Sequence, residues 1–203
     1  MGSEWRFFGE VFVTLFVIVD PPGTIPLFLS LTSGRSPAVR RRTAWQAASV
    51  ALLVITAFAL FGQQLLDYLG ITLPALQCAG GLLLLLVALQ LLTGQESETV
   101  ASRDVNVALV PLGTPLLAGP GAIVATMVFV RRVDDTADAV ALAAGVVAVH
   151  FVLWLTMRYS LVIIRVIRES GVVLVSRIAG LLLSAIAVQL VADAVRAFVT
   201  EVA

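Results

Sequence analysis

VFVTLFVIVDPPGTIPLFLSLT, residues 11–32, is apolar enough to cross a bilayer, yet its centre carries an aspartate, two adjacent prolines and a glycine: Asp20, Pro21, Pro22 and Gly23. A proline inside a helix costs about 3 kcal/mol, and an ionisable group at mid-membrane costs roughly as much again. We therefore expect two half-helices that meet at a break. Non-helical backbone occurs at membrane depth only where it faces protein or a water-filled cavity, so the break marks a candidate binding site.

The composition of the whole chain indicates an integral membrane protein. Of its 203 residues 60% are hydrophobic and only 13% are charged, with a mean hydropathy of +1.03. The basic residues are all arginines that fall between apolar runs, which is typical of topology signals, so we expect no nucleic-acid partner. One cysteine, Cys78, and one histidine, His150, cannot build a metal site of nitrogen and sulfur ligands. We expect neither a metal nor another cofactor.

Six apolar runs are long enough to cross a hydrocarbon core, which takes about 20 residues in helical form. They lie near residues 8–31, 44–66, 73–93, 107–130, 138–164 and 175–199. Small residues at four-residue spacing in the second run (Ala44 and Ala48) and in the fifth (Ala141 and Gly145) predict close helix packing. The expected fold is an all-α membrane protein with six transmembrane helices.

The arginines predict the orientation in the membrane. Nine of the 13 basic residues follow the first, third and fifth runs, and cytoplasmic loops carry the excess of arginine. We therefore expect both termini on the outer, periplasmic side of the inner membrane. The cluster Arg40, Arg41 and Arg42 is interpreted as an anchor that contacts anionic lipid headgroups.

The sequence also contains an internal repeat. AGGLLLLLVALQL (79–91) resembles IAGLLLSAIAVQL (178–190), and the Pro120-Gly121-Ala122-Ile123 segment matches Pro22-Gly23-Thr24-Ile25 at nearly the same offset. The repeats, residues 1–98 and 99–203, would each hold three spans, so the second copy would be inverted relative to the first. An inverted three-helix repeat whose first helices (the first and fourth spans) are both broken at mid-membrane indicates a secondary transporter with a midplane site.

Three segments resemble the signature segments of the MarC family, also called the small neutral amino acid transporter family. They are DPPGTIPLFLSLT (20–32), PLLAGPGAI (115–123) and RIAGLLLSAIAVQLVADAV (177–195). The resemblance implies a six-helix inner-membrane protein of bacteria or archaea and, for some members, proton-linked movement of glycine, alanine and similar amino acids. The chain departs from the first motif at Thr24, where an asparagine is common, and at Pro22, which precedes the glycine.

The two breaks differ in charge. Asp20 supplies a carboxylate, which either only caps the second half-helix or also attracts an ammonium group or holds a proton. The second break has Ala118 and Gly119 at the corresponding positions, so free amides near Pro120 and Gly121 would attract an anion. This asymmetry suits a zwitterion with its ammonium group toward the first break and its carboxylate toward the second. The alternative is that proline and glycine only kink the helix for packing.

Other polar residues in the apolar runs are further candidates. Gln90 and Gln189 are related by the repeat and contact either the substrate or a neighbouring helix. Thr24 and Thr114 each offer a hydroxyl near one break. His150 either relays protons or bonds to a neighbouring helix.

We interpret the chain as a secondary transporter or exporter of small neutral amino acids, glycine-like or alanine-like, with the substrate held between the breaks. The resemblance implies protons as the coupling ion, with sodium as the alternative. The expected partners are the amino acid, the coupling ion and membrane lipid. The sequence leaves open whether the protein forms a homo-oligomer. Two rivals remain: an intramembrane enzyme that uses Asp20 and His150, and a passive channel. The enzyme is disfavoured because neither a GxSxG nor an HExxH motif is present.

Overall fold

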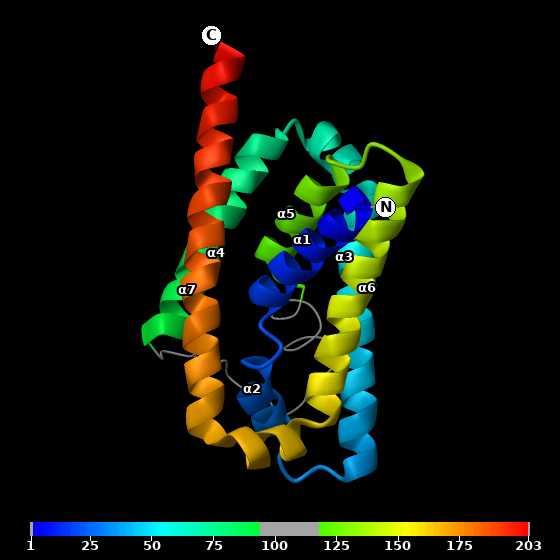
Figure 1. Cartoon of the computed structure of the whole chain (residues 1–203), viewed down its shortest axis with the longest axis vertical. Helices are drawn as coiled ribbons and strands as arrows, with labels where there is room; N and C mark the ends of the chain where they lie inside the picture. The colour runs from blue at the N-terminus through cyan, green and yellow to red at the C-terminus, as the bar shows by residue number, and fades with distance from the viewer. Residues whose placement is uncertain (1, 94–117, 203) are drawn as a thin grey trace.

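The computed structural model describes residues 2–93 and 118–202, and every regular element within them is an α-helix (Figure 1). The helices are α1 (Gly2–Val19), α2 (Thr24–Leu31), α3 (Pro37–Leu69), α4 (Leu73–Thr93), α5 (Pro120–Val130), α6 (Thr136–Arg158) and α7 (Ser160–Val202). The predicted all-α class is therefore confirmed. Thr114 and the first part of the predicted fourth span lie outside the described residues.

Four helices of the described chain are long and apolar enough to cross a membrane. They are α3, α4, α6 and the Ser170–Thr200 part of α7, while α1 and α2 are bent by 50° at their junction and count as a fifth span if the pair forms one. The α4 helix coincides with the predicted run 73–93. Both chain ends lie toward the same end of the molecule, at the top of Figure 1.

The predicted fifth run, 138–164, is wrong at its C-terminal end. The α6 helix ends at Arg158, and Tyr159, with ψ of 15°, closes it. The following residues start α7, which leaves helical geometry at Arg168 (φ 61°, ψ 166°) before it continues as the long Ser170–Thr200 helix. Hydropathy did not reveal this division because the polar stretch Arg158-Tyr159-Ser160 is short and apolar residues resume at Leu161. Figure 1 shows the first part of α7 crossing the lower end of the bundle.

One buried cluster joins α1, α3, α5 and α6. The small residues expected to mediate close packing are buried in it, including Ala44 and Ala48 of α3 and Ala141 of α6. At Gly145 of α6 an added Cβ would lie 2.7 Å from Cγ1 of Val11 on α1. Glycine is required here because α1 and α6 approach too closely for a side chain.

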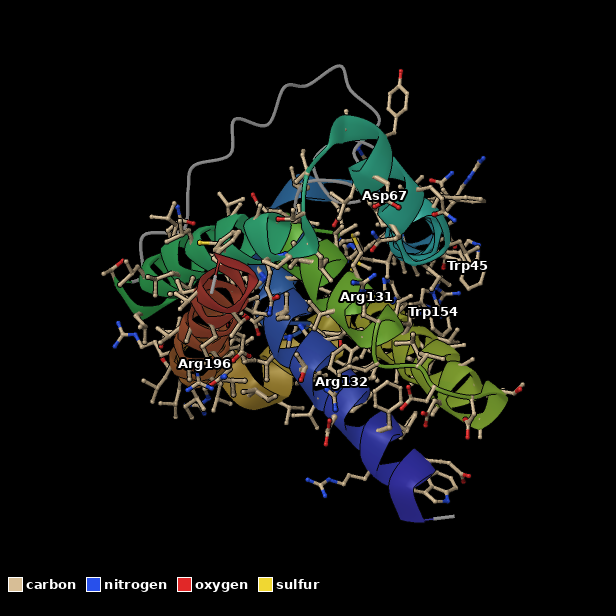
Figure 2. The ribbon with its side chains drawn as sticks, turned by 90° about the horizontal axis from the view of Figure 1, so that it is seen from above. Trp45, Asp67, Arg131, Arg132, Trp154 and Arg196 are labelled. Carbon is tan, nitrogen blue, oxygen red and sulfur yellow. The ribbon has the colours of Figure 1, made fainter. Side chains whose placement is uncertain are left out.

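The upper end of the bundle is linked by polar contacts between α1 and the segment after α5. Arg132 Nη2 lies 2.8 Å from Glu10 Oε2, and the Arg132 guanidinium also covers the Phe7 ring at 5.4 Å from its centroid. Figure 2 shows Arg132 beside the α1 ribbon. Because both charged side chains are partly exposed, the pair contributes at most about 1 kcal/mol. The pair fixes the position of the segment after α5 relative to α1 more than it stabilises the fold.

The α4 and α7 helices run in opposite directions and pack against each other through two glycines (Figure 1). An added Cβ at Gly81 of α4 would lie 2.8 Å from the Ala187 carbonyl oxygen of α7. An added Cβ at Gly180 of α7 would lie 3.2 Å from the Ala88 carbonyl oxygen of α4. The two contacts are reciprocal, since each glycine meets the carbonyl that lies seven residues beyond the other glycine.

We expect Gly81→Val and Gly180→Val each to destabilise the protein by roughly 1–3 kcal/mol, because a larger side chain would force the two backbones apart. The thermal unfolding midpoint of the detergent-solubilised protein measures this effect. Gly9→Val is the matched control, because nothing lies within 4 Å of an added Cβ at Gly9. Equal midpoints for all three variants would show that the glycines do not set the α4–α7 distance.

Candidate functional site

The junction of α1 and α2 is an ordered turn. Asp20 adopts a positive φ of 43°, yet its amide still donates to the Phe16 carbonyl at 3.0 Å. On the other side of the turn, the Thr24 amide donates to the Asp20 carbonyl at 3.1 Å and the Ile25 amide donates to the Pro22 carbonyl at 3.1 Å. Aspartate tolerates the left-handed region better than most residues, and a proline has no amide that needs a partner. The sequence therefore permits the bend while keeping these backbone groups paired.

The Asp20 side chain closes this turn from inside the protein. It is 7% exposed, and its Oδ1 accepts a hydrogen bond from the Gly23 amide at 3.2 Å. An added Cβ at Gly23 would collide with Asp20 Oδ2 and lie 2.8 Å from Asp20 Cγ. Glycine is therefore required at position 23 for the carboxylate to reach the amide. The expected capping role of Asp20 has this geometric basis, although α2 itself begins at Thr24 with Gly23 as its N-cap.

The Thr24 hydroxyl is engaged within the turn. Thr24 is buried, and its Oγ1 donates to the Pro21 carbonyl at 2.7 Å. Its single hydroxyl proton is therefore used locally, and only acceptor capacity remains for another group. If Thr24 binds a ligand, as predicted, its hydroxyl acts as a hydrogen-bond acceptor.

Sequence reasoning missed a residue that the fold brings to this turn. Ser176 of α7 is 5% exposed, and its hydroxyl oxygen lies 3.0 Å from the position of an added Cβ at Gly23. The hydroxyl makes no hydrogen bond to a described residue. A signal was present in the repeat, because Ser176 aligns with Gln77 at the same offset that aligns Gly180 with Gly81, and both positions are polar within apolar runs.

The second predicted break coincides with the start of α5. Gly119 is the N-cap, with φ −59° and ψ 160°, and Pro120 is the first helical residue. The Ala122 and Ile123 amides both donate to the Gly119 carbonyl, at 3.0 and 3.2 Å. Fewer amides are therefore available here than predicted, and only the Gly121 amide of the first turn has no acceptor among the described residues.

Gly121 also has a packing role that its sequence position did not reveal. A Cβ added there would collide with the Leu84 side chain of α4. A substitution at Gly121 would therefore disturb the α4–α5 contact, so a loss of binding in such a variant would not by itself report on the amide.

The two breaks share a buried environment. Val19 is the last residue of α1 and Ala118 lies two residues before α5, and both belong to the same buried apolar cluster. In Figure 1 the α1–α2 junction and the start of α5 both lie near the middle of the bundle's length.

His150 is buried in α6, where its Nδ1 lies 2.8 Å from the Val146 carbonyl oxygen. Because a carbonyl can only accept, Nδ1 carries the proton, and Nε2 of the neutral ring is left as an acceptor. No described residue donates to Nε2. This hydrogen bond connects His150 to a residue of its own helix.

The two repeat-related glutamines do not join the breaks through any described hydrogen bond. Gln90 and Gln189 are both exposed. The Gln189 amide donates to Asp193 Oδ1 at 2.8 Å, one turn along the same helix. This bond lies within α7, whereas a bond between helices was one of the two expected roles.

Comparison with known proteins extends over almost the whole chain. A family model described as MarC family integral membrane protein matches residues 5–199. The chain belongs to the MarC family. No solved structure matches it.

Relatives of this MarC chain occur in both archaea and bacteria. A UPF0056 membrane protein of Methanocaldococcus jannaschii is 34% identical over 200 residues, which covers 95% of this chain and 98% of the relative. One from Aquifex aeolicus is 35% identical over 198 residues, covering 93% and 92% of the two chains. The UPF0056 membrane protein YhcE of Escherichia coli is 31% identical over 203 residues, covering 95% and 94%. These names describe membrane proteins and give no substrate.

We expect Gly23→Ala to destabilise the protein by about 1–3 kcal/mol, because the added methyl group would push the buried Asp20 carboxylate off the Gly23 amide. Thermal unfolding in detergent measures the loss. Asp20→Ala alone and the double variant complete a double-mutant cycle, in which removing the carboxylate first should abolish most of the Gly23→Ala effect. Purely additive losses would show that the two side chains do not compete for this space.

Proposed function

We propose that this MarC protein is a secondary transporter or exporter of small neutral amino acids, coupled to protons, with its substrate held between the two breaks. The observation that carries the proposal is the buried Asp20 carboxylate at the 50° bend between two apolar helices. A buried charge inside a membrane span is costly and usually serves a function. Broken helices place such groups where substrates bind in many transporters.

The reciprocal glycine contacts of α4 and α7 support the inverted-repeat part of the proposal. In a two-fold interface residue i contacts j while j contacts i. Gly81 and Gly180 are related by the repeat, and so are the carbonyls of Ala88 and Ala187 that they approach. Two inverted copies of one three-helix unit, residues 1–98 and 99–203, would produce this pattern, with α1–α2 and α5 at corresponding places.

The site suits a small substrate that carries one positive and one negative charge. A carboxylate at the first break attracts an ammonium group, and the Gly121 amide at the positive end of α5 attracts a carboxylate. We therefore infer a transporter that carries out no covalent chemistry.

Counterflow in proteoliposomes tests the function. Unlabelled alanine inside the vesicles should accelerate entry of labelled glycine, and an imposed pH gradient should drive accumulation. Asp20→Asn should keep the turn, because asparagine caps nearly as well and also tolerates a positive φ, but it should lose the response to pH. Entry without counterflow would indicate a channel, and no entry of either amino acid would refute the proposed substrate class.

The proposed orientation has both termini outside. In a variant without Cys78, we expect an impermeant maleimide to label Thr136→Cys in intact cells and to label Ala38→Cys only after permeabilisation. Both positions are exposed at opposite ends of the bundle, at the starts of α6 and α3. The reverse labelling pattern would show that the termini lie inside, and it would leave the description of the fold unchanged.

A further inference from the structure

The Ser176 hydroxyl lacks the backbone hydrogen bond that Ser184 and Thr200 of the same helix make, as does the buried Ser160 hydroxyl at the start of α7. Ser184 Oγ donates to the Leu181 carbonyl at 2.7 Å, and Thr200 Oγ1 donates to the Arg196 carbonyl at 3.0 Å. Bonding back to a carbonyl one turn earlier is the usual way in which serine and threonine satisfy their hydroxyls in a helix. Ser176 makes no such bond although it is 5% exposed. A buried hydroxyl without a partner calls for an explanation, because leaving it unpaired is costly.

The direction of the hydroxyl supplies that explanation. Its oxygen and the Asp20 carboxylate both lie close to the position that a side chain at Gly23 would occupy. The α2 helix packs against α7, so this approach is part of the helix packing. Glycine at position 23 lets the carboxylate and the hydroxyl come close to each other, since a Cβ there would collide with Asp20 Oδ2 and lie 3.0 Å from Ser176 Oγ.

We propose that Ser176 is a ligand-binding residue, whose hydroxyl oxygen and the Asp20 carboxylate together receive a small monovalent cationic group at the first break. A carboxylate and a hydroxyl both offer oxygen lone pairs, which suit either the hydrogens of a primary ammonium group or a bare sodium ion. Arg177, the next residue along α7, is exposed while Ser176 is buried. At the turn, Asp20 therefore supplies a carboxylate and Ser176 supplies a neutral oxygen acceptor.

The cationic group has two possible sources. It is the ammonium group of the transported amino acid, in which case the inference rests on the proposed function, or it is the coupling ion. Glycine in sodium-free choline buffer presents the first source alone, and sodium chloride without amino acid presents the second.

Calorimetric binding to the purified, detergent-solubilised full chain tests the proposal. We expect Ser176→Ala to weaken binding by about tenfold to a hundredfold, the loss of a hydrogen bond to a charged group, and Ser176→Thr, which keeps the hydroxyl, to retain most of the affinity. Ser184→Ala is the matched control from the same helix and should bind as the wild type does. Alanine is smaller than serine and favours helix, so the variant should fold, and an unchanged thermal midpoint verifies this.

The outcomes separate this inference from the proposed function. A Ser176-dependent loss with glycine alone identifies the substrate ammonium, and a loss with sodium alone identifies the coupling ion. Equal affinities of the wild type and Ser176→Ala for both ligands would overturn the inference and leave amino-acid binding intact. A wild-type protein that binds sodium through Ser176 but binds neither glycine nor alanine would refute the substrate class and retain the site. Binding of neither ligand would overturn both.

Discussion

The bond from the Gly23 amide to the Asp20 carboxylate is the interaction on which the centre of this protein depends. A helix interrupted inside an apolar bundle must pair its polar backbone groups within the protein, because lipid offers no partners. The two prolines remove donors, Asp20 adopts a positive φ where the chain bends by 50°, and Gly23 gives the carboxylate room to reach the amide. Each unusual residue of the turn thus meets one requirement of the same bend.

That bend can be held in place only because close helix contacts surround it. Glycines and alanines let backbones approach on both sides of the turn, at Gly145 against α1 and at Gly81 and Gly180 between α4 and α7. In a membrane, van der Waals contacts between closely approaching helices provide the stabilisation that hydrophobic burial provides in water. The same close packing places Ser176 of α7 beside Gly23 of the first turn, although 153 positions separate them in the sequence.

The sequence predicted the features that follow from composition and local chemistry. The all-α class and the bounds of α4 agree with the structure, because long apolar runs leave few alternatives. Residues 20–23 separate α1 from α2 at a bend of 50°, and a break of one span at mid-membrane stays a prediction. The sequence did not predict the end of α6 at Arg158, where only three polar residues interrupt the apolar sequence. It also did not predict the proximity of Ser176 to Gly23, which depends on tertiary packing. It overestimated the free amides at α5, since the Gly119 carbonyl accepts from two of them.

Capping explains an oxygen at position 20 but does not explain a charge there. The Gly23 amide needs only an acceptor, and an asparagine would supply one, tolerate the same backbone conformation and avoid burying a carboxylate. Burying a carboxylate rather than an amide at this position therefore adds a desolvation cost. A cation received between that carboxylate and the Ser176 hydroxyl would offset this cost and at the same time satisfy the hydroxyl. Such a ligand would thus account for a buried hydroxyl that makes no hydrogen bond to a described residue.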